Sequence, residues 1–515
     1  MSKKSRTRAT ASSVATKPQA SRLPVPEALL ALACTFVASY LGLGLFGLQS
    51  SISVTLPPLA GIIAALACRD WRLAGPIAGI GVIGGILFGA AHFTVSSGVT
   101  LSPTVYCIEG VLAAGVGSTT AILLKHRENL ERWVAWLGVA LTILGALQSG
   151  WLQAKLPSES GAGTTSFDLY TSTPTVTADI SDVAMWVLTV RRMNAGSDYY
   201  TAMGHTFEEI NAARPIGAWN IEDPAQYRMP TLYWLLAALP QDGNGWVIAM
   251  LVLVSSAIIA SWSIASRYTP VAVALTGTTV TSAYLAGFTT INLPQTELWA
   301  GLLALVAVAL ALKSLSVRNN PLAWAGAAAG VALLATLTRE LAVAFLIVGL
   351  GSTLVHDRWR SRRLWIPWAA ALGLAAIAYY AHAQAAEAIG RTLENLGRSS
   401  TASFIARHFD PTGRGLVSSV TDMSGWAYWT LGAGWVIWVL GTIGGLIGPR
   451  DWPRRALLGG VTAGGAIALF FLHPQGRLWQ SLPPGYWGQV VLPTVITCAP
   501  LAFARIPAIK VSAEK

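Results

Sequence analysis

Long apolar stretches recur along the whole chain and restrict the environments in which it can fold. Of 515 residues, 53% are hydrophobic and only 11% are charged, whereas soluble domains carry about 25% charged residues. A hydrocarbon core about 30 Å thick needs roughly 20 apolar residues for each helical crossing. A soluble protein could not bury this much apolar surface, so the sequence predicts an all-α polytopic membrane protein.

The apolar stretches number about fourteen, and each is close to the length of one transmembrane helix. Five of them precede a long polar stretch, and the others follow it. The expected spans are 28–48, 52–68, 74–96, 105–124, 133–152, 245–266, 269–291, 296–312, 321–337, 341–355, 364–382, 426–446, 456–472 and 486–504. One further apolar piece, residues 229–240, is too short to cross and is expected to lie in the membrane interface or to dip into it.

Positively charged residues mark alternate joints between these spans. The net charge of +11 is distributed so that the intervening joints, such as 49–51 and 96–102, carry no Lys or Arg. Under the positive-inside rule, the basic joints are expected to face the cytoplasm. This arrangement predicts a multi-pass protein of the plasma (inner) membrane with both termini cytoplasmic. The basicity is therefore a topology signal and not an indication of nucleic-acid binding.

This topology divides the chain into three predicted parts. Residues 1–26 form a polar, basic and disordered cytoplasmic tail, residues 27–130 an N-terminal extension of four membrane helices, and residues 131–515 the main membrane module. The module is expected to hold three outer loops, which are residues 153–228, 383–425 and 473–485. Extracytoplasmic chemistry is expected in these loops.

The first outer loop contains a predicted amphipathic helix. Val183, Trp186 and Val190 recur at i, i+3 and i+7, the spacing of one helical face. Gly196 is placed to end this helix, since glycine commonly follows a helix C-terminus. Asp182 then lies in the first turn. We expect the helix to lie along the outer membrane surface, with Asp182 near the lipid–water boundary.

Two further motifs follow Asp182 and its helix: the turn Gly196-Ser197-Asp198-Tyr199-Tyr200 and the segment Tyr227-Arg228-Met229-Pro230-Thr231-Leu232-Tyr233-Trp234. Together with Asp182 they resemble GT-C membrane glycosyltransferases, in particular members that use a polyprenol-phosphate-linked mannose. Thr338-Arg339-Glu340 resembles a basic position at the outer end of a later helix, and Tyr486-Trp487-Gly488-Gln489 resembles the entry to the final span. The chain departs from the family at Thr231, where a second proline is usual, and in its four extra N-terminal spans.

The resemblance implies a transmembrane catalytic module that transfers a sugar from a polyprenyl-phosphate carrier to an acceptor hydroxyl, usually with inversion. The implied partners are the polyprenyl-phosphate-linked sugar, a glycan or lipid acceptor, and the membrane lipids. Such a transfer needs a base for the hydroxyl proton and cations or donors for the departing phosphate. Asp182 is the candidate base.

Arg339 is the first candidate for binding the phosphate. It lies at the outer end of an apolar span, where a charge is costly, and a guanidinium presents a planar fork of donors to phosphate oxygens. Arg228, His473 and Arg477 are second candidates.

Acceptor binding is assigned to residues of the first outer loop. Tyr199, Tyr200 and Trp219 offer aromatic faces that suit sugar rings, and Asp198 is a further candidate, although it is also well placed as a turn former. The sequence contains no close-spaced Cys or His pattern of a metal site. Some members of the family use a divalent cation, so a cation remains an open expectation without assigned ligands.

Other interpretations of these residues remain open. Asp182 could be only a first-turn acid, and Arg339 could pair with its neighbour Glu340. A polysaccharide polymerase or ligase that uses lipid-diphosphate-linked glycans would depend on loop residues such as Arg407 and His408. A lipid or solute transporter would carry charges near the bilayer midplane, whereas most charges here lie at span ends and in outer loops.

Overall fold

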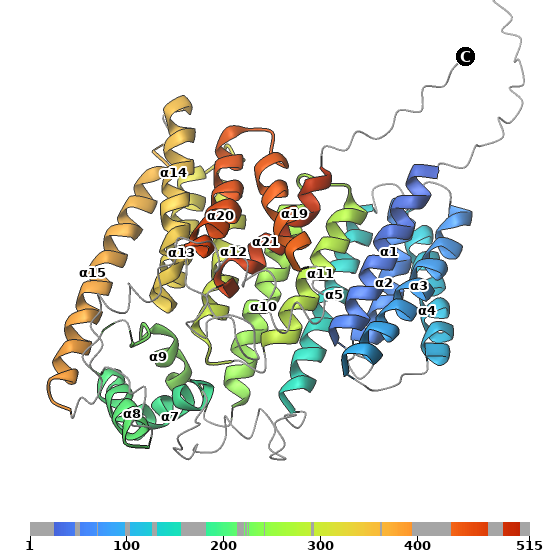
Figure 1. The fold of residues 1–515 in the computed structure, drawn as a ribbon. Helices are drawn as coiled ribbons and strands as arrows, with labels where there is room; N and C mark the ends of the chain where they lie inside the picture. The colour runs from blue at the N-terminus through green and yellow to red at the C-terminus, as the bar shows by residue number, and fades with distance from the viewer. Residues whose placement is uncertain are drawn as a thin grey trace, which may run out of the picture.

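The protein is a bundle of helices, seen in a computed structural model (Figure 1). The structure describes residues 25–46, 52–68, 71–97, 103–125, 131–155, 182–213, 221, 224, 226–240, 243–289, 293–360, 363–393, 434–471 and 488–504. Within these ranges every regular element is helical. The predicted all-α class is therefore confirmed for the described part of the chain.

The first five helices pack closely through small residues. They are α1 (Val25–Phe46), α2 (Ile52–Ala67), α3 (Trp71–Ser97), α4 (Pro103–Lys125) and α5 (Glu131–Lys155). A Cβ added to Gly61 of α2 would lie 2.1 Å from the carbonyl oxygen of Ala114, and one added to Gly117 of α4 would lie 2.1 Å from that of Pro58. Glycine is required at these two positions because the backbones of α2 and α4 nearly touch, as is common between membrane helices.

The longer second part of the bundle begins after residue 243. Its elements are α10 (Asn244–Ala265), α11 (Val271–Thr289), α12 (Thr296–Ser314), α13 (Pro321–Thr338), η1 (Glu340–Ala342), α14 (Val343–Arg360), α15 (Trp365–Gly390), α19 (Gly434–Ile447), α20 (Trp452–Phe470), η2 (Gly488–Val490), α21 (Leu492–Cys498) and η3 (Ala499–Phe503). Helix α11 contacts α1, α2 and α5 as well as α10, α21 and η3. It therefore joins the N-terminal helices to the rest of the bundle.

Three short helices form a layer across one end of the bundle (Figure 1). They are α7 (Asp182–Asn194), α8 (Tyr199–Ala213) and α9 (Thr231–Ala238). Helix α7 packs against both α8 and α9, and α8 packs against α15. Gly196 follows α7 with φ +105°, so the predicted end of the amphipathic helix is confirmed by a left-handed residue that glycine adopts without strain.

Seven helices are long and apolar enough to cross a membrane. They are α3, α5, α10, α12, α13, α15 and the helical stretch Glu340–Asp357. Every predicted span overlaps a helix, and the remaining apolar helices in the described ranges are shorter. The structure thus supports a membrane-embedded chain, while the count of fourteen crossings stays a prediction. The short helix α9 has only 8 residues, as expected for an apolar piece that does not cross.

Two features of the helices differ from the sequence-based expectation. Helix α8 was not predicted, although Tyr199, Met203, Phe207 and Ile210 recur at helical spacing and are buried. Helix α15 continues to Gly390, beyond the expected end at residue 382, because the Ala- and Glu-containing stretch that follows favours helix.

The last expected span is not one continuous α-helix. It is divided into η2, α21 and η3. Pro493 and Pro500 lie at the first positions of α21 and η3. Proline cannot donate a backbone hydrogen bond, so it begins a helical segment but interrupts a continuing one.

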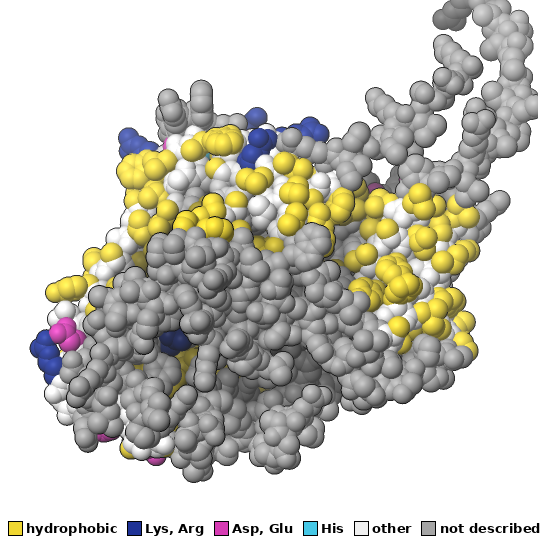
Figure 2. Space-filling model, viewed as in Figure 1, with side chains coloured by type: hydrophobic (Ala, Val, Ile, Leu, Met, Phe, Trp, Pro, Cys, Tyr) yellow, Lys and Arg dark blue, Asp and Glu magenta, His cyan; other side chains and the backbone are white. Residues whose placement is uncertain are grey.

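Basic side chains lie along one end of the bundle. The start of α1 and the end of η3 both lie at the end away from α7, α8 and α9 (Figure 1). Lys and Arg side chains gather along the rim of that same end (Figure 2). This distribution agrees with termini on the basic side of the membrane, and the side of the membrane itself stays a prediction.

Cysteine labelling tests this orientation. Ala195→Cys, in the exposed turn after α7, should react on intact cells with a membrane-impermeant maleimide, whereas Asn319→Cys, in the exposed turn between α12 and α13, should react only after permeabilisation. The native Cys34, Cys68 and Cys498 are buried and Cys107 is partly exposed, so the labelling of the unmodified protein is measured as the background. The opposite order of labelling would place the layer of short helices in the cytoplasm.

Candidate functional site

A buried ion pair lies where the membrane bundle meets the layer of short helices. Glu297 belongs to the first turn of α12, and Arg339 follows the last residue of α13. Arg339 Nε lies 2.9 Å from Glu297 Oε1, and Arg339 Nη1 also pairs with Glu340 Oε1. The side chains of Glu297 and Arg339 are 0% and 2% exposed. Each charge therefore depends on the other, since an isolated charge in such a place is strongly destabilising.

A second arginine approaches the same carboxylate. Arg228 Nη2 lies 4.0 Å from Glu297 Oε1, and the Arg228 side chain is 16% exposed. Arg228 is thus the more accessible of the two cations that converge on Glu297. It lies in the short joint that leads into α9, so its guanidinium connects the layer of short helices to α12.

The position of Arg228 is held from helix α8. Tyr199 Oη donates a hydrogen bond of 2.5 Å to the backbone carbonyl of Arg228. The Tyr199 ring stacks on Tyr233 of α9, with 5.3 Å between ring centroids. Burial raises the pKa of Tyr199 well above its usual value, and the nearby Tyr233 raises it further. The hydroxyl therefore stays protonated and acts as the donor.

The neighbouring Tyr200 ties α8 to helix α15. Tyr200 Oη lies 3.0 Å from His382 Nδ1, and His382 is buried. Burial and the charge of Asp198 raise the pKa of Tyr200 to about 12, so its hydroxyl can donate to an unprotonated imidazole nitrogen. The two adjacent tyrosines thus fix α8 against α9 on one side and against α15 on the other.

Asp198 caps the start of α8. Its Oδ1 accepts hydrogen bonds from the backbone N–H groups of Tyr200 and Thr201, at 3.0 and 3.2 Å, and its Oδ2 accepts one from the Thr201 hydroxyl. Partial burial raises the pKa of Asp198, but these hydrogen bonds outweigh that effect and leave it below its usual value. Asp198 is thus the N-cap of α8, a role that its interpretation as a turn former did not include.

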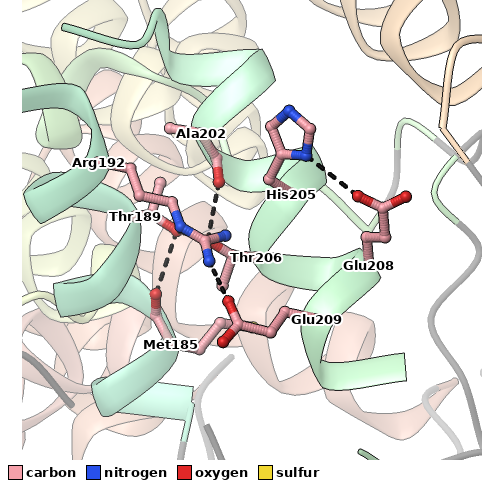
Figure 3. A network of polar contacts seen from close by, with 8 residues as sticks. All are labelled: Met185, Thr189, Arg192, Ala202, His205, Thr206, Glu208 and Glu209. Atoms are coloured by element: carbon pink, nitrogen blue, oxygen red, sulfur yellow. Dashed lines mark hydrogen bonds and ion pairs between the residues drawn. The ribbon is translucent and has the colours of Figure 1, made fainter. Parts of the chain in front are cut away.

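A polar network on the outer surface joins α7 to α8 (Figure 3). Arg192 donates to the Thr206 hydroxyl at 2.9 Å and pairs with Glu209. His205 Nδ1 lies 3.0 Å from Glu208 Oε2. His205 and Glu209 are half-exposed and Glu208 is 38% exposed, whereas Arg192 is less exposed and Thr206 is buried. The network holds the two helices together and lies apart from the buried ion pair.

The structure brings together only some of the predicted site residues. Arg339 and Arg228 converge on one carboxylate, whereas Tyr199 is buried in packing that leaves no face for a sugar ring. Helix α7 does begin at Asp182. Four predicted candidates have side chains outside the described residues, namely Asp182, Trp219, His473 and Arg477. Arg407 and His408, on which the alternative interpretation depends, also lie outside them.

Glu297 is the functional candidate that sequence reasoning missed. It is the single acid in the predicted span 296–312, and an ionisable residue in a membrane helix commonly has a partner or a function. The presence of one acid in an apolar span was therefore sufficient to select Glu297 as a candidate. The neighbouring Gln295 is 1% exposed, and neither atom of its amide has a partner among the described residues. The cluster therefore has hydrogen-bonding capacity beyond the ion pair.

Comparisons with known proteins assign no function to this site, so its interpretation depends on the chemistry of its residues. No family model, no curated protein and no solved structure matches this chain. In the described part of the chain, no three His, Cys, Asp or Glu side chains are grouped so that they could hold a metal ion. The described cluster is thus a set of arginines and carboxylates.

Removing the Glu297 charge should destabilise the protein strongly. Glu297→Gln leaves Arg339 buried beside fewer negative charges, and we expect a loss of about 3–5 kcal/mol in the free energy of unfolding. The measurement is SDS-induced unfolding in mixed micelles. Combining Glu297→Gln with Arg339→Met should cost at least about 1 kcal/mol less than the sum of the single losses, because the two residues interact directly.

Glu209→Gln is the matched control for this measurement. It removes a carboxylate that is 50% exposed and also pairs with an arginine, so its effect should stay within about 1 kcal/mol. Equal losses for Glu297→Gln and Glu209→Gln would contradict the structural role of the buried pair.

Proposed function

We propose that this chain is a membrane glycosyltransferase of the GT-C type. It transfers a sugar from a polyprenyl-phosphate carrier to an acceptor hydroxyl at the extracytoplasmic face of the membrane. The observation that carries the proposal is the convergence of Arg228 and Arg339 on the buried Glu297, directly beneath the layer of short helices. The sequence resemblance around Asp182 and Arg228 supports the same assignment.

The location of the cluster suits a lipid-linked phosphate. The cluster lies at the ends of α12 and α13, where the long apolar helices stop and the α7–α9 layer begins. A polyprenyl-phosphate has its chain in the hydrocarbon and its phosphate at this boundary. Cations at span ends have a lower desolvation cost than cations at mid-membrane, and they attract phosphate strongly.

Arg228 is the better placed of the two arginines to contact the phosphate. Arg339 is 2% exposed and already pairs with Glu297 and Glu340, whereas Arg228 is 16% exposed and lies 4.0 Å from Glu297. We therefore assign the phosphate contact to Arg228. Arg339 is a positioning residue, because it neutralises and orients the carboxylate that faces Arg228. This assignment reverses the order expected from sequence.

The proposed transfer is a single displacement at the anomeric carbon. Asp182, at the start of α7, accepts the proton of the acceptor hydroxyl. The acceptor oxygen forms the new bond to the anomeric carbon while the bond from that carbon to the phosphate oxygen breaks. The leaving polyprenyl-phosphate takes the electron pair of the broken bond, and Arg228 stabilises the added negative charge. Because the attack comes from the face opposite the phosphate, the configuration inverts.

Replacement of Asp182 tests the proposed base. Asp182→Asn keeps the size of the side chain and removes its basicity, so sugar transfer from a polyprenyl-phosphate donor should fall by about 10²- to 10⁴-fold. The rate is measured with purified protein in nanodiscs and a radiolabelled donor. Glu208→Gln is the control, since Glu208 is a half-exposed carboxylate of the same layer outside the proposed site. Unchanged transfer by Asp182→Asn would end the assignment of the base.

Replacement of Arg228 tests the phosphate contact separately. Arg228→Gln should reduce kcat/KM for the lipid-linked donor by roughly 10²-fold, because a charge-assisted contact to the phosphate is lost. The acceptor KM should change little. Arg228→Lys keeps the charge but not the planar fork, and it should recover part of the activity. A loss confined to the acceptor KM would assign Arg228 to acceptor binding instead.

A further inference from the structure

Four charged side chains form a continuous chain of contacts beneath the layer of short helices. Arg228 Nη2 and Arg339 Nε lie 4.0 and 2.9 Å from the same oxygen, Glu297 Oε1. Arg339 Nη1 in turn lies 2.5 Å from Glu340 Oε1. Positive and negative charges therefore alternate along the chain. Three separate segments supply these residues, namely the joint before α9, the first turn of α12, and the stretch from the end of α13 into η1.

The two ends of this chain are accessible, whereas its middle is buried. The side chains of Glu297 and Arg339 are 0% and 2% exposed. Arg228, at one end, is 16% exposed, and Glu340, at the other end, is 33% exposed. A ligand that reaches the chain therefore meets a cation at one end and a carboxylate at the other.

Glu340 has hydrogen-bonding capacity that its own contacts do not use. Helix α13 stops at Thr338 because Arg339 has an extended backbone, with φ −148° and ψ 118°, and Glu340 then begins η1. In the part of the chain that the structure describes, Arg339 is the one residue that pairs with Glu340, and the contact uses Oε1. An ionised carboxylate can accept about four hydrogen bonds, so Oε2 is available to a ligand.

The charge of Glu340 is not needed to neutralise the buried arginine. Arg339 already meets Glu297 at 2.9 Å, and one such partner compensates a buried charge. A further carboxylate repels the phosphate proposed at Arg228, since like charges placed close together are unfavourable. A site for a phosphate alone would thus bind more strongly without Glu340. The position of Glu340 therefore indicates a ligand that carries hydrogen-bond donors as well as a phosphate.

Gln295 adds an unsatisfied polar group beside the same carboxylate. It lies two residues before Glu297 and is 1% exposed, and neither atom of its amide has a partner among the described residues. Buried polar groups are nearly always satisfied. An amide both donates and accepts, as a hydroxyl group does. A ligand rich in hydroxyl groups would supply partners of this kind.

We propose that Glu340 binds hydroxyl groups of the sugar on the lipid-linked donor and selects neutral sugars against acidic ones. The inference rests on the proposed function, because the phosphate at Arg228 holds the other end of the donor. The three contacts that join Arg228 to Glu340 are each 4.0 Å or shorter, which brings both ends within reach of one phosphorylated sugar. The sugar hydroxyls donate charge-assisted hydrogen bonds to Glu340. A sugar with a carboxylate of its own is repelled.

Binding of three lipids to the full-length protein tests this proposal. They are short-chain analogues of polyprenyl-phosphate, polyprenyl-phosphate-mannose and polyprenyl-phosphate-mannuronate. Affinities are measured by scintillation proximity on the purified protein, with no acceptor present. The native protein should bind the mannose lipid about tenfold more tightly than the bare phosphate lipid, as expected for hydrogen bonds to a charged group. It should bind the mannuronate lipid about tenfold more weakly than the mannose lipid.

Replacement of Glu340 separates hydroxyl recognition from a structural role. Glu340→Gln keeps the shape of the side chain and removes its charge, so the mannose lipid should bind about tenfold more weakly. The bare phosphate lipid should bind at least as tightly as to the native protein, because a repelling charge is gone. The preference for mannose over mannuronate should largely disappear. Glu340→Asp keeps the charge and should retain this preference.

Glu387→Gln is the matched control. Glu387 is a carboxylate that is 42% exposed and pairs with Arg391, and its replacement should leave all three affinities unchanged. Unchanged affinities of Glu340→Gln for the mannose and mannuronate lipids would overturn the inference and leave the proposed function standing. Failure of the native protein to bind any of the three lipids would overturn the proposed function together with the inference.

Discussion

The buried contact between Glu297 and Arg339 is the constraint on which the arrangement of this protein depends. A carboxylate that is 0% exposed and a guanidinium that is 2% exposed can remain charged only because they meet. Their pairing fixes the end of α13 against the start of α12. It also determines where a second cation, Arg228, can approach. The position of the short helices relative to the membrane bundle follows from that approach.

The layer of short helices is attached at several independent points. Tyr199 holds the backbone of Arg228, Tyr200 contacts His382 of α15, and Arg192 links α7 to α8. Each contact joins residues far apart in the sequence, so the layer is held as a unit and not as a set of separate loops. The proposed base at the start of α7 would thereby be placed on a rigid support, as the proposed displacement requires.

Local physical rules were sufficient to predict most of the helices and some of the site residues from the sequence. The apolar spans and the helix end at Gly196 follow from length, hydrophobicity and backbone freedom, which are properties of neighbouring residues. Arg339 could be selected because a charge at a span end is costly whatever surrounds it. The pairing of Arg339 with Glu297 could not be predicted, since 42 residues separate the two and only packing brings α12 and α13 together.

Helix α8 was missed because Asp198 was interpreted as a turn residue, and the same carboxylate serves equally as an N-cap. The break in the last span could have been foreseen from Pro493 and Pro500.

Helix α15 links the height of the short-helix layer to the thickness of the bilayer. Its 26 residues make a rod about 39 Å long, roughly 9 Å more than the hydrocarbon core needs. The helix continues for about 12 Å beyond His382, which meets Tyr200. A thicker bilayer favours a more upright α15, and a thinner one favours a greater tilt. We therefore expect acyl-chain length to set how far the α8 layer stands from the membrane surface.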